Sequence, residues 1–385
     1  MNNVNLHEPI LEKKDFLSLK NCFDSGWISA GGLYEKKFEN LLKKKIKAKY
    51  ISAIINCTSA LQISLMLAGA RSSHEVLVPT ITFVSTINAV LYNNATPLFM
   101  DIDDYFNLDE KKTIEFLNHH TFFKNGKTYN RKTKKIISTI IIVHTFGNAA
   151  KFDKLFSLCK KKNIQIIEDA AASLGTKYKK GIFKSKYTGT LGLAGCISFN
   201  GNKIITSGGG GAIVTGNKNI LKKSKHLINQ SKVDAINFIH DEVGFNMKIS
   251  NLHAAIGFSQ LKKLEKYILI KKKIHELYSK KLNEINGLKI LPVPDYCQSN
   301  YWLNILEFDP KIYKLNKSQI IKKLIKNNIN VRSVWYPNHL QKPFKKYNSY
   351  KITKALKKVN NSICLPSSVN LSKKIINKIF TLLNV

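Results

Sequence analysis

A lysine and an aspartate, each just beyond a short apolar stretch, are the residues of this sequence best suited to do chemistry together. Lys203 lies in a polar turn after the apolar segment 195–199, and four glycines and the apolar segment 212–214 follow it. Asp169 follows the apolar segment 164–167. A lysine amine forms a Schiff base with the aldehyde of pyridoxal 5'-phosphate (PLP), and a carboxylate keeps the pyridine nitrogen protonated so that the ring accepts electrons. The pair predicts PLP chemistry with Lys203 and Asp169 as catalytic residues.

Each of these features also has a simpler explanation. A lysine in a lysine-rich chain is usually a solvated surface group, and an aspartate after a strand is often the cap of a helix. Glycine runs are often loops without a catalytic role. The two residues by themselves leave both explanations open, so their surroundings must decide.

Other residues could complete a cofactor site. The segment 56–60 is expected where a strand leads into a helix, and the N–H groups and dipole of a helix N-terminus attract phosphate. Thr58 and Ser59 add hydroxyls there, and Ser198, five residues before the lysine, could reach the same phosphate. Phe83 could stack on the pyridine ring, although most such residues belong to a core. These four residues are predicted cofactor contacts.

Composition describes an ordinary globular protein of 385 residues with 44% hydrophobic and 10% aromatic residues. A chain of this length can bury a large core, most simply as a main domain with a smaller one attached. Six scattered cysteines without a C-x-x-C pair indicate reduced thiols and no metal site. We expect a cytoplasmic protein, because the sequence shows neither a signal peptide nor an 18-residue apolar stretch.

The formal net charge of +37 is extreme and raises the question of nucleic-acid binding. The lysines are spread through nearly every segment and form no single stripe, so we predict no nucleic-acid partner. A positive field of this kind favours anionic substrates that carry phosphate.

Apolar and helical segments alternate along most of the chain, which predicts an α/β fold with a mostly parallel, doubly wound sheet. Residues 1–30 form an expected lead-in with a helix at 13–24, residues 31–265 a large domain, and residues 266–385 a small C-terminal α+β domain. A linking helix is expected at about 252–284, and the polar stretch 104–135 is expected to hold a helix and a surface excursion. The strands expected in the large domain are 50–55, 75–78, 96–100, 136–143, 164–167, 195–199 and 212–214, and those in the small domain lie near 302–307 and 331–334.

Taken together, these motifs resemble the DegT/DnrJ/EryC1/StrS family of nucleotide-sugar aminotransferases. The similarity covers nearly the whole chain and runs through the segments 26–29, 58–61, 82–86, 144–147, 168–171, 198–211, 240–246 and 365–368. It implies the aspartate aminotransferase-like fold, known as PLP fold type I. The segments 6–9, 206–211 and 300–303 look most like the branch that acts on nucleotide-linked 4-keto-6-deoxy-hexosamines, which includes enzymes of the legionaminic acid and bacillosamine routes.

The resemblance assigns roles to individual residues. Lys203 would hold the cofactor covalently and move a proton to the sugar carbon, and Asp169 would bind the pyridine nitrogen. The family builds its site across a homodimer interface, so Asn246 would reach the phosphate bound by the neighbouring subunit. L-glutamate would be the amino donor and a UDP-linked 4-keto-6-deoxy-N-acetylhexosamine the acceptor. The residues expected to contact that sugar and its phosphates are His7, Trp27, Ser29, His240, Lys248, Arg332, Trp335 and His339.

The sequence departs from the family pattern at three places. Ala172 stands where a glutamine, histidine or glutamate usually contacts the cofactor ring. Glycine replaces a glutamate that is common in the glycine run, which puts the identity of the sugar in doubt. Met247 and Lys248 replace the usual Tyr-Arg after Asn246, and a lysine lacks the two-pronged grip of arginine on an anion.

Several other functions compete with 4-aminotransfer. A 3-aminotransferase or a 3-dehydratase of the same family would share the site, but the dehydratases carry histidine in place of the Schiff-base lysine. A nucleotide-sugar oxidoreductase would need its glycines between a first strand and a helix, whereas here the glycines precede a strand. A non-catalytic basic binding protein on the same fold would not need Lys203 and Asp169.

Overall fold

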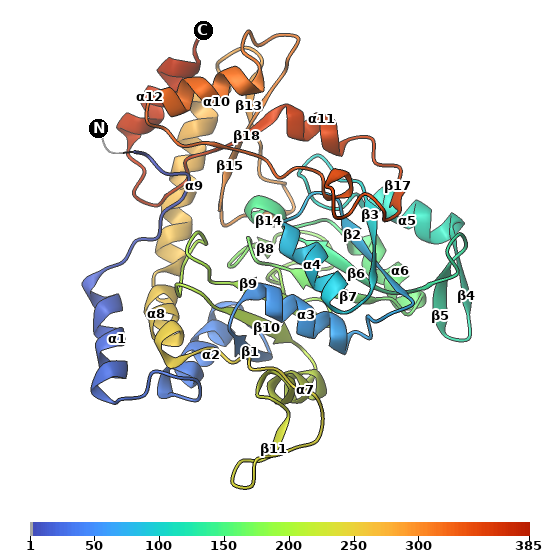
Figure 1. Cartoon of the computed structure of the whole chain (residues 1–385). Helices are drawn as coiled ribbons and strands as arrows, with labels where there is room; N and C mark the ends of the chain where they lie inside the picture. Colours follow the sequence, from blue (N-terminus) through green and yellow to red (C-terminus); the bar gives the residue numbers. More distant parts are fainter. Residues whose placement is uncertain (1–2) are drawn as a thin grey trace.

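The computed structural model describes residues 3–385 and arranges them around a ten-stranded sheet and a separate four-stranded sheet (Figure 1). The main path of the large sheet has the order β1-β10-β9-β7-β6-β2-β3-β17. Every pair from β9 to β17 is parallel, and β10 runs against both of its neighbours. The α/β class with a mostly parallel sheet is therefore confirmed. The strands are β1 Tyr50–Ile54, β2 His74–Pro79, β3 Thr96–Met100, β4 Thr121–Lys124, β5 Lys127–Asn130, β6 Ile136–Val143, β7 Gln165–Asp169, β9 Ala194–Ser198, β10 Gly211–Thr215 and β17 Ser349–Tyr350.

Continuous apolar runs form these strands because both faces of the sheet are covered. In β6, Ile141 and Val143 pack into one hydrophobic cluster, while Ile140 and Ile142 pack into another on the opposite face. Helices α3, α4 and α7 contribute to the first face, and α2, α5, α6 and α8 to the second. These helices are α2 Leu33–Lys45, α3 Cys57–Leu67, α4 Val84–Tyr92, α5 Glu110–His119, α6 Asp153–Lys161, α7 Lys218–Ile228 and α8 Asn251–Leu261.

The small sheet is antiparallel and has the order β13-β15-β18-β16. Its core includes buried residues of three helices that pack on it, α9, α10 and α12. The small-domain elements are α9 Leu264–Leu282, β13 Leu288–Ile290, β15 Asn304–Phe308, α10 Lys317–Lys326, β16 Arg332–Ser333, α11 Ala355–Asn360, β18 Ser362–Leu365 and α12 Lys373–Leu383. The remaining elements are α1 Lys13–Asp24, η1 Thr145–Gly147, β8 Lys177–Tyr178, β11 Lys232–Asp234, β12 Ile239–His240, β14 Cys297–Gln298 and η2 Asn338–Leu340.

Two segments differ from their expected form. The linking helix is divided into α8 and α9, because the N–H groups of Lys262 and Lys263 donate three residues back and tighten the turn between them. The surface excursion within 104–135 is a β-hairpin, β4–β5, that extends the large sheet beside β6.

A late segment of the chain returns to the large sheet. Strand β17 pairs with β3, and the buried carboxylate of Asp101 accepts the backbone N–H groups of Thr353, Lys354 and Ala355. Phe344 packs in the core of the large domain. Residues within 266–385 thus complete the large sheet, and the division at residue 265 stays a prediction. Among residues 3–385, no helix has the length and apolar character that a membrane crossing requires.

Candidate active site

A cavity of about 270 Å³ lies at the carboxyl ends of the central strands, and both predicted catalytic residues line it. In an open parallel sheet the loops beyond these strand ends form the usual binding crevice. Asp169 ends β7, and Lys203 follows β9. A larger, more open hollow of about 700 Å³ lies beside β13 and α11, away from these strand ends.

Asp169 is held firmly at the floor of the cavity. Its side chain is 5% exposed, Oδ2 accepts a hydrogen bond from the Thr86 hydroxyl at 2.7 Å, and Oδ1 accepts the Ala171 N–H at 3.1 Å. Thr82 hydrogen-bonds to Thr86 at 2.7 Å and extends the network. A carboxylate with fixed orientation in a buried setting can hold a protonated ring nitrogen.

Lys203 presents an ammonium group that has no hydrogen-bond acceptor or carboxylate partner within residues 3–385. Its Nζ lies 4.1 Å from the centroid of the Trp302 ring. Burial lowers the pKa of Lys203, although the Cys57 thiol and the Asp169 carboxylate oppose that effect. An amine of this kind is neutral more often than a surface lysine, so it can attack an aldehyde or accept a proton.

The N-terminus of α3 faces the same cavity. The N-cap residue Asn56 accepts the N–H of Ser59 at 2.8 Å, which leaves the N–H groups of Cys57 and Thr58 without an intrahelical acceptor. Gly211 lets the glycine run approach this helix end, because a Cβ at that position would lie 2.6 Å from the carbonyl carbon of Asn56. The arrangement suits a phosphate group.

Aromatic residues form the wall above the cavity floor. Phe83 is 57% exposed, lines the cavity and lies 6.2 Å from Trp335 between ring centroids. Trp335 also packs on Phe146 at 4.7 Å. Ala172 is buried in the hydrophobic cluster against which this wall packs, so this part of the cavity lining is apolar.

The second acid of β7 has a structural partner. Glu168 is buried on the face opposite Asp169 and accepts the backbone N–H groups of Gly189 and Gly192 at 2.9 Å. The Ala150 N–H donates to Nδ1 of His144, so the ring proton lies on Nε2 and is donated to Glu168 at 3.0 Å. These bonds fix the His144 ring, which lines the cavity.

The structure brings together some predicted residues and leaves others apart. Lys203, Asp169, Thr58, Phe83, Ser198 and Trp335 line the cavity. Ser59 is buried in the first turn of α3, outside the cavity lining. His339 hydrogen-bonds to Thr80 at 2.6 Å behind the wall, also outside that lining.

The remaining predicted substrate residues are not part of the cavity lining. Both ring nitrogens of His7 are buried and have no hydrogen-bond partner among the described residues. Lys248 forms an ion pair with Glu35 at 3.3 Å. Trp27, Ser29, His240 and Arg332 are exposed, as is Asn246. Their proposed roles in binding therefore stay predictions.

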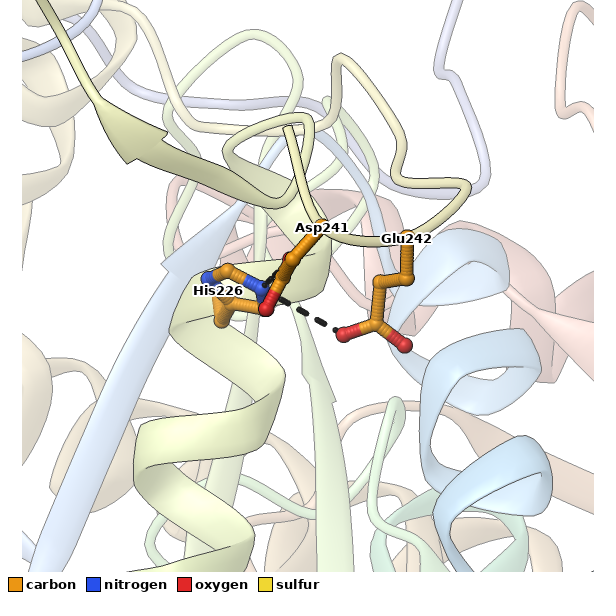
Figure 2. A group of neighbouring side chains, drawn as sticks. All are labelled: His226, Asp241 and Glu242. Carbon is orange, nitrogen blue, oxygen red and sulfur yellow. Dashed lines mark hydrogen bonds and ion pairs between the residues drawn. The ribbon is translucent and has the colours of Figure 1, made fainter. Parts of the chain in front are cut away.

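The segment that carries Asn246 is tied to α7 by a charged cluster (Figure 2). Nε2 of His226 lies 2.6 Å from Oδ1 of Asp241 and 3.3 Å from Oε1 of Glu242. The His226 hydrogen bond lowers the pKa of Asp241. Lys223 also forms an ion pair with Glu242, so a cation of the chain already neutralises the carboxylates of this cluster. We interpret the cluster as an anchor that holds the segment against α7.

Sequence reasoning missed several residues of the site. Thr86, which holds Asp169, lies in the first turn of α4 and precedes the aspartate by 83 residues in the chain. Trp302 comes from the segment between β14 and β15 and reaches the Lys203 turn across about 100 residues. The segment 144–147 contributes to the family resemblance, but its residue types do not indicate that His144 faces the cavity.

The site and the fold together have the features of one class of enzymes. A mostly parallel sheet with an acid and a lysine at its strand ends, followed by a small C-terminal domain, is the arrangement of the fold type I PLP enzymes. The free ammonium group, the fixed carboxylate and the open helix N-terminus are the donors and acceptors that PLP needs, so the residues present fit this cofactor.

Comparison with known proteins identifies the family. Residues 9–384 match the model of the DegT/DnrJ/EryC1/StrS aminotransferase family. The chain belongs to this family of PLP-dependent sugar aminotransferases, and the predictions of family, enzyme class and cofactor are confirmed.

Three curated relatives and one solved structure illustrate the similarity. The putative pyridoxal phosphate-dependent aminotransferase EpsN of Bacillus subtilis is 30% identical, with 96% of this chain and 92% of the relative covered. GDP-perosamine synthase of Escherichia coli is 30% identical over 97% and 96%. UDP-4-amino-4,6-dideoxy-N-acetyl-beta-L-altrosamine transaminase of Campylobacter jejuni is 30% identical over 81% and 78%. Helicobacter pylori PseC, an aminotransferase involved in pseudoaminic acid biosynthesis, shares the fold with a TM-score of 0.88, 23% identity and coverage of 99% and 98%.

The close approach of Gly211 to α3 gives a testable prediction. Gly211→Ala should lower the free energy of unfolding by about 1–3 kcal/mol and weaken PLP binding, because the new Cβ forces backbone atoms apart. Gly216→Ala is the matched control, since a Cβ there meets nothing within 4 Å. Denaturant unfolding and a spectroscopic PLP titration measure the two effects. Equal behaviour of the two variants would show that the approach is unimportant.

Proposed function

We propose that this chain transfers an amino group from L-glutamate to C4 of a nucleotide-linked 4-keto-6-deoxy sugar. The observation that carries the proposal is the pairing of a free lysine ammonium and a fixed carboxylate on one cavity, in a chain of this family. When bound, PLP supplies the electron sink that makes amino transfer between two carbon atoms feasible.

In this proposal each residue of the site has a separate role. Lys203 attaches the cofactor and moves the proton at the reacting carbon, and Asp169 holds the ring nitrogen. Thr58, Ser198 and the α3 N-terminus bind the phosphate, with Ser59 placed in the same turn. Phe83 covers a face of the ring. The aromatic wall keeps water away from the reacting atoms, which favours transfer over hydrolysis.

The proposed acceptor rests on weaker support than the reaction class. One relative is named for a UDP-linked 4-amino-4,6-dideoxy sugar and another for GDP-perosamine, so the relatives do not agree on the nucleotide. The net charge of +37 supports a substrate with a diphosphate but does not distinguish bases. We propose a UDP-linked 4-keto-6-deoxy-N-acetylhexosamine, with Trp335 at the cavity and His7, Trp27, Ser29, His240, Lys248, Arg332 and His339 along the path of the sugar nucleotide.

A homodimer with shared sites completes the proposal. The hairpin β11–β12 projects from the body of the chain (Figure 1). Two large apolar side chains of the hairpin are exposed, Ile236 at 86% and Phe238 at 71%, and Val243 just after it is 87% exposed. Asn246 is exposed at the base of this hairpin, where a second subunit would bring it to a neighbouring cavity.

The cofactor assignment is tested by two substitutions. Lys203→Ala should lose both turnover and the cofactor fixed to the protein by borohydride, whereas Lys180→Ala, whose side chain is 63% exposed, should keep both. Asp169→Asn should still bind PLP but lose activity equivalent to several kcal/mol in the barrier, on the order expected for a main electrostatic term. Turnover by Lys203→Ala would contradict the central role of this lysine.

The shared site is tested by complementation. Lys203→Ala and Asn246→Ala subunits should each be poorly active, and a mixture that exchanges subunits should recover activity because one of its two sites is intact. Sedimentation shows the oligomeric state of each sample. A mixed dimer no more active than its parents would indicate independent sites.

The acceptor is tested with a panel of UDP-, GDP- and dTDP-linked 4-keto and 3-keto sugars in the presence of glutamate. We expect 2-oxoglutarate release and a 4-amino product, identified by mass, with the UDP-linked 4-keto N-acetylhexosamine used best. Preference for the GDP sugar would change the proposed nucleotide alone. Amination of 3-keto sugars only would replace the proposal by 3-aminotransfer.

A further inference from the structure

Trp302 contacts the lysine turn in two separate ways. Its indole N–H donates to the carbonyl oxygen of Asn202 at 2.7 Å, and its ring face lies 4.1 Å from the Lys203 ammonium. The side chain is only 3% exposed, and its backbone N–H is fixed by Oδ1 of Asn300 at 3.0 Å. A residue from the far part of the chain therefore holds both the backbone and the side chain of the turn.

We propose that Trp302 is a positioning residue for Lys203: its N–H bond holds the turn, and its ring face stabilises the ammonium form of the amine. The inference rests on the function proposed for Lys203 and deepens it. Cation–π attraction of this kind grows as the pair is shielded from water, and here Trp302 is buried and Lys203 is half-buried.

The charged and titratable groups around Lys203 make this contact important. Burial favours the neutral amine, and the Asp169 carboxylate on β7 favours the ammonium form. The Cys57 thiol of α3 stays protonated because burial raises its pKa. His7 of the lead-in is close enough that Lys203 contributes to lowering the pKa of its imidazole. None of these groups hydrogen-bonds to the ammonium within residues 3–385, and the Trp302 ring is in direct contact with it.

Packing alone would not explain both contacts of Trp302 with the lysine turn. Trp302 and Trp335 belong to the same aromatic cluster, with ring centroids 6.3 Å apart. Trp335 contacts Phe146 and Phe83, and no contact of it with the Lys203 ammonium is found among the described residues. A buried indole N–H needs an acceptor, but packing does not require that acceptor to be the Lys203 turn, nor the ring to lie over the amine, and Trp302 has both contacts.

The first experiment measures the amine without cofactor. The full-length protein, freed of PLP, is labelled with trace acetic anhydride over a series of pH values, and the Lys203 peptide is quantified by mass spectrometry. Only the neutral amine reacts, so the midpoint reports the pKa of this lysine. Trp302→Leu should lower the midpoint by about 0.4–1.5 pH units, the range that a cation–π contact of about 0.5–2 kcal/mol gives.

Trp302→Phe and Trp335→Leu separate the two contacts from general packing. Trp302→Phe keeps a ring and loses the N–H, so its midpoint should lie between those of the wild type and Trp302→Leu. Trp335→Leu removes a large aromatic from the same cluster and should leave the midpoint unchanged. An unchanged midpoint in both Trp302 variants, or an equal shift in Trp335→Leu, would overturn the inference.

A second measurement covers the case in which Trp302→Leu does not fold. Added PLP reacts with the Lys203 amine as the nitrogen bonds to the aldehyde carbon and the aldehyde oxygen leaves as water, and borohydride then fixes the product. Trp302→Phe should slow this attachment severalfold once the rate is divided by the fraction of neutral amine given by the labelling midpoint, because the turn has lost its hydrogen bond. Attachment at the wild-type rate would contradict the positioning role, whereas PLP fixed to a different lysine in the wild type would instead contradict the proposed function.

Discussion

Two adjacent acids at the end of β7 are the point on which the rest of the site depends. Successive side chains of a strand point to opposite faces, so Glu168 and Asp169 cannot both face the cavity. Glu168 turns to the far face, where the 189–192 loop and His144 satisfy it. Asp169 faces the cavity and is held by Thr86. A buried carboxylate without such partners would be costly, so this network fixes the loop, the strand and the acid together.

The glycine run follows from the same arrangement. β10 lies between β1 and β9, and its first residue is in contact with the start of α3, so the sheet brings the lysine turn and the phosphate end of the helix side by side. Any side chain at Gly211 would push these parts away from each other. Close packing of the backbone thus explains the glycine run. A nucleotide-binding glycine motif is not needed to explain it.

The sequence alone predicted which site residues lie at the ends of strands. It predicted few of the residues that reach the site from distant parts of the chain. Lys203 and Asp169 could be found because apolar runs mark buried strands and polar residues after them share one edge of the sheet. Thr86 and Trp302 could not be found in this way, because each reaches the site by tertiary packing over a long sequence separation. Trp27, Arg332 and Asn246 are exposed in one chain, so their roles depend on a substrate and a second subunit.

Strand β17 has a mechanical consequence for the cavity. The segment from Trp335 to Tyr350 belongs by sequence to the second half of the chain, but β3, Thr80 and Thr82 bind its backbone and the Asn338 side chain. The aromatic wall is therefore mounted on the large sheet. The hydrophobic cluster around this wall also contains Ile305 and Cys364 of the small sheet, so the wall is the place where the two sheets are packed together.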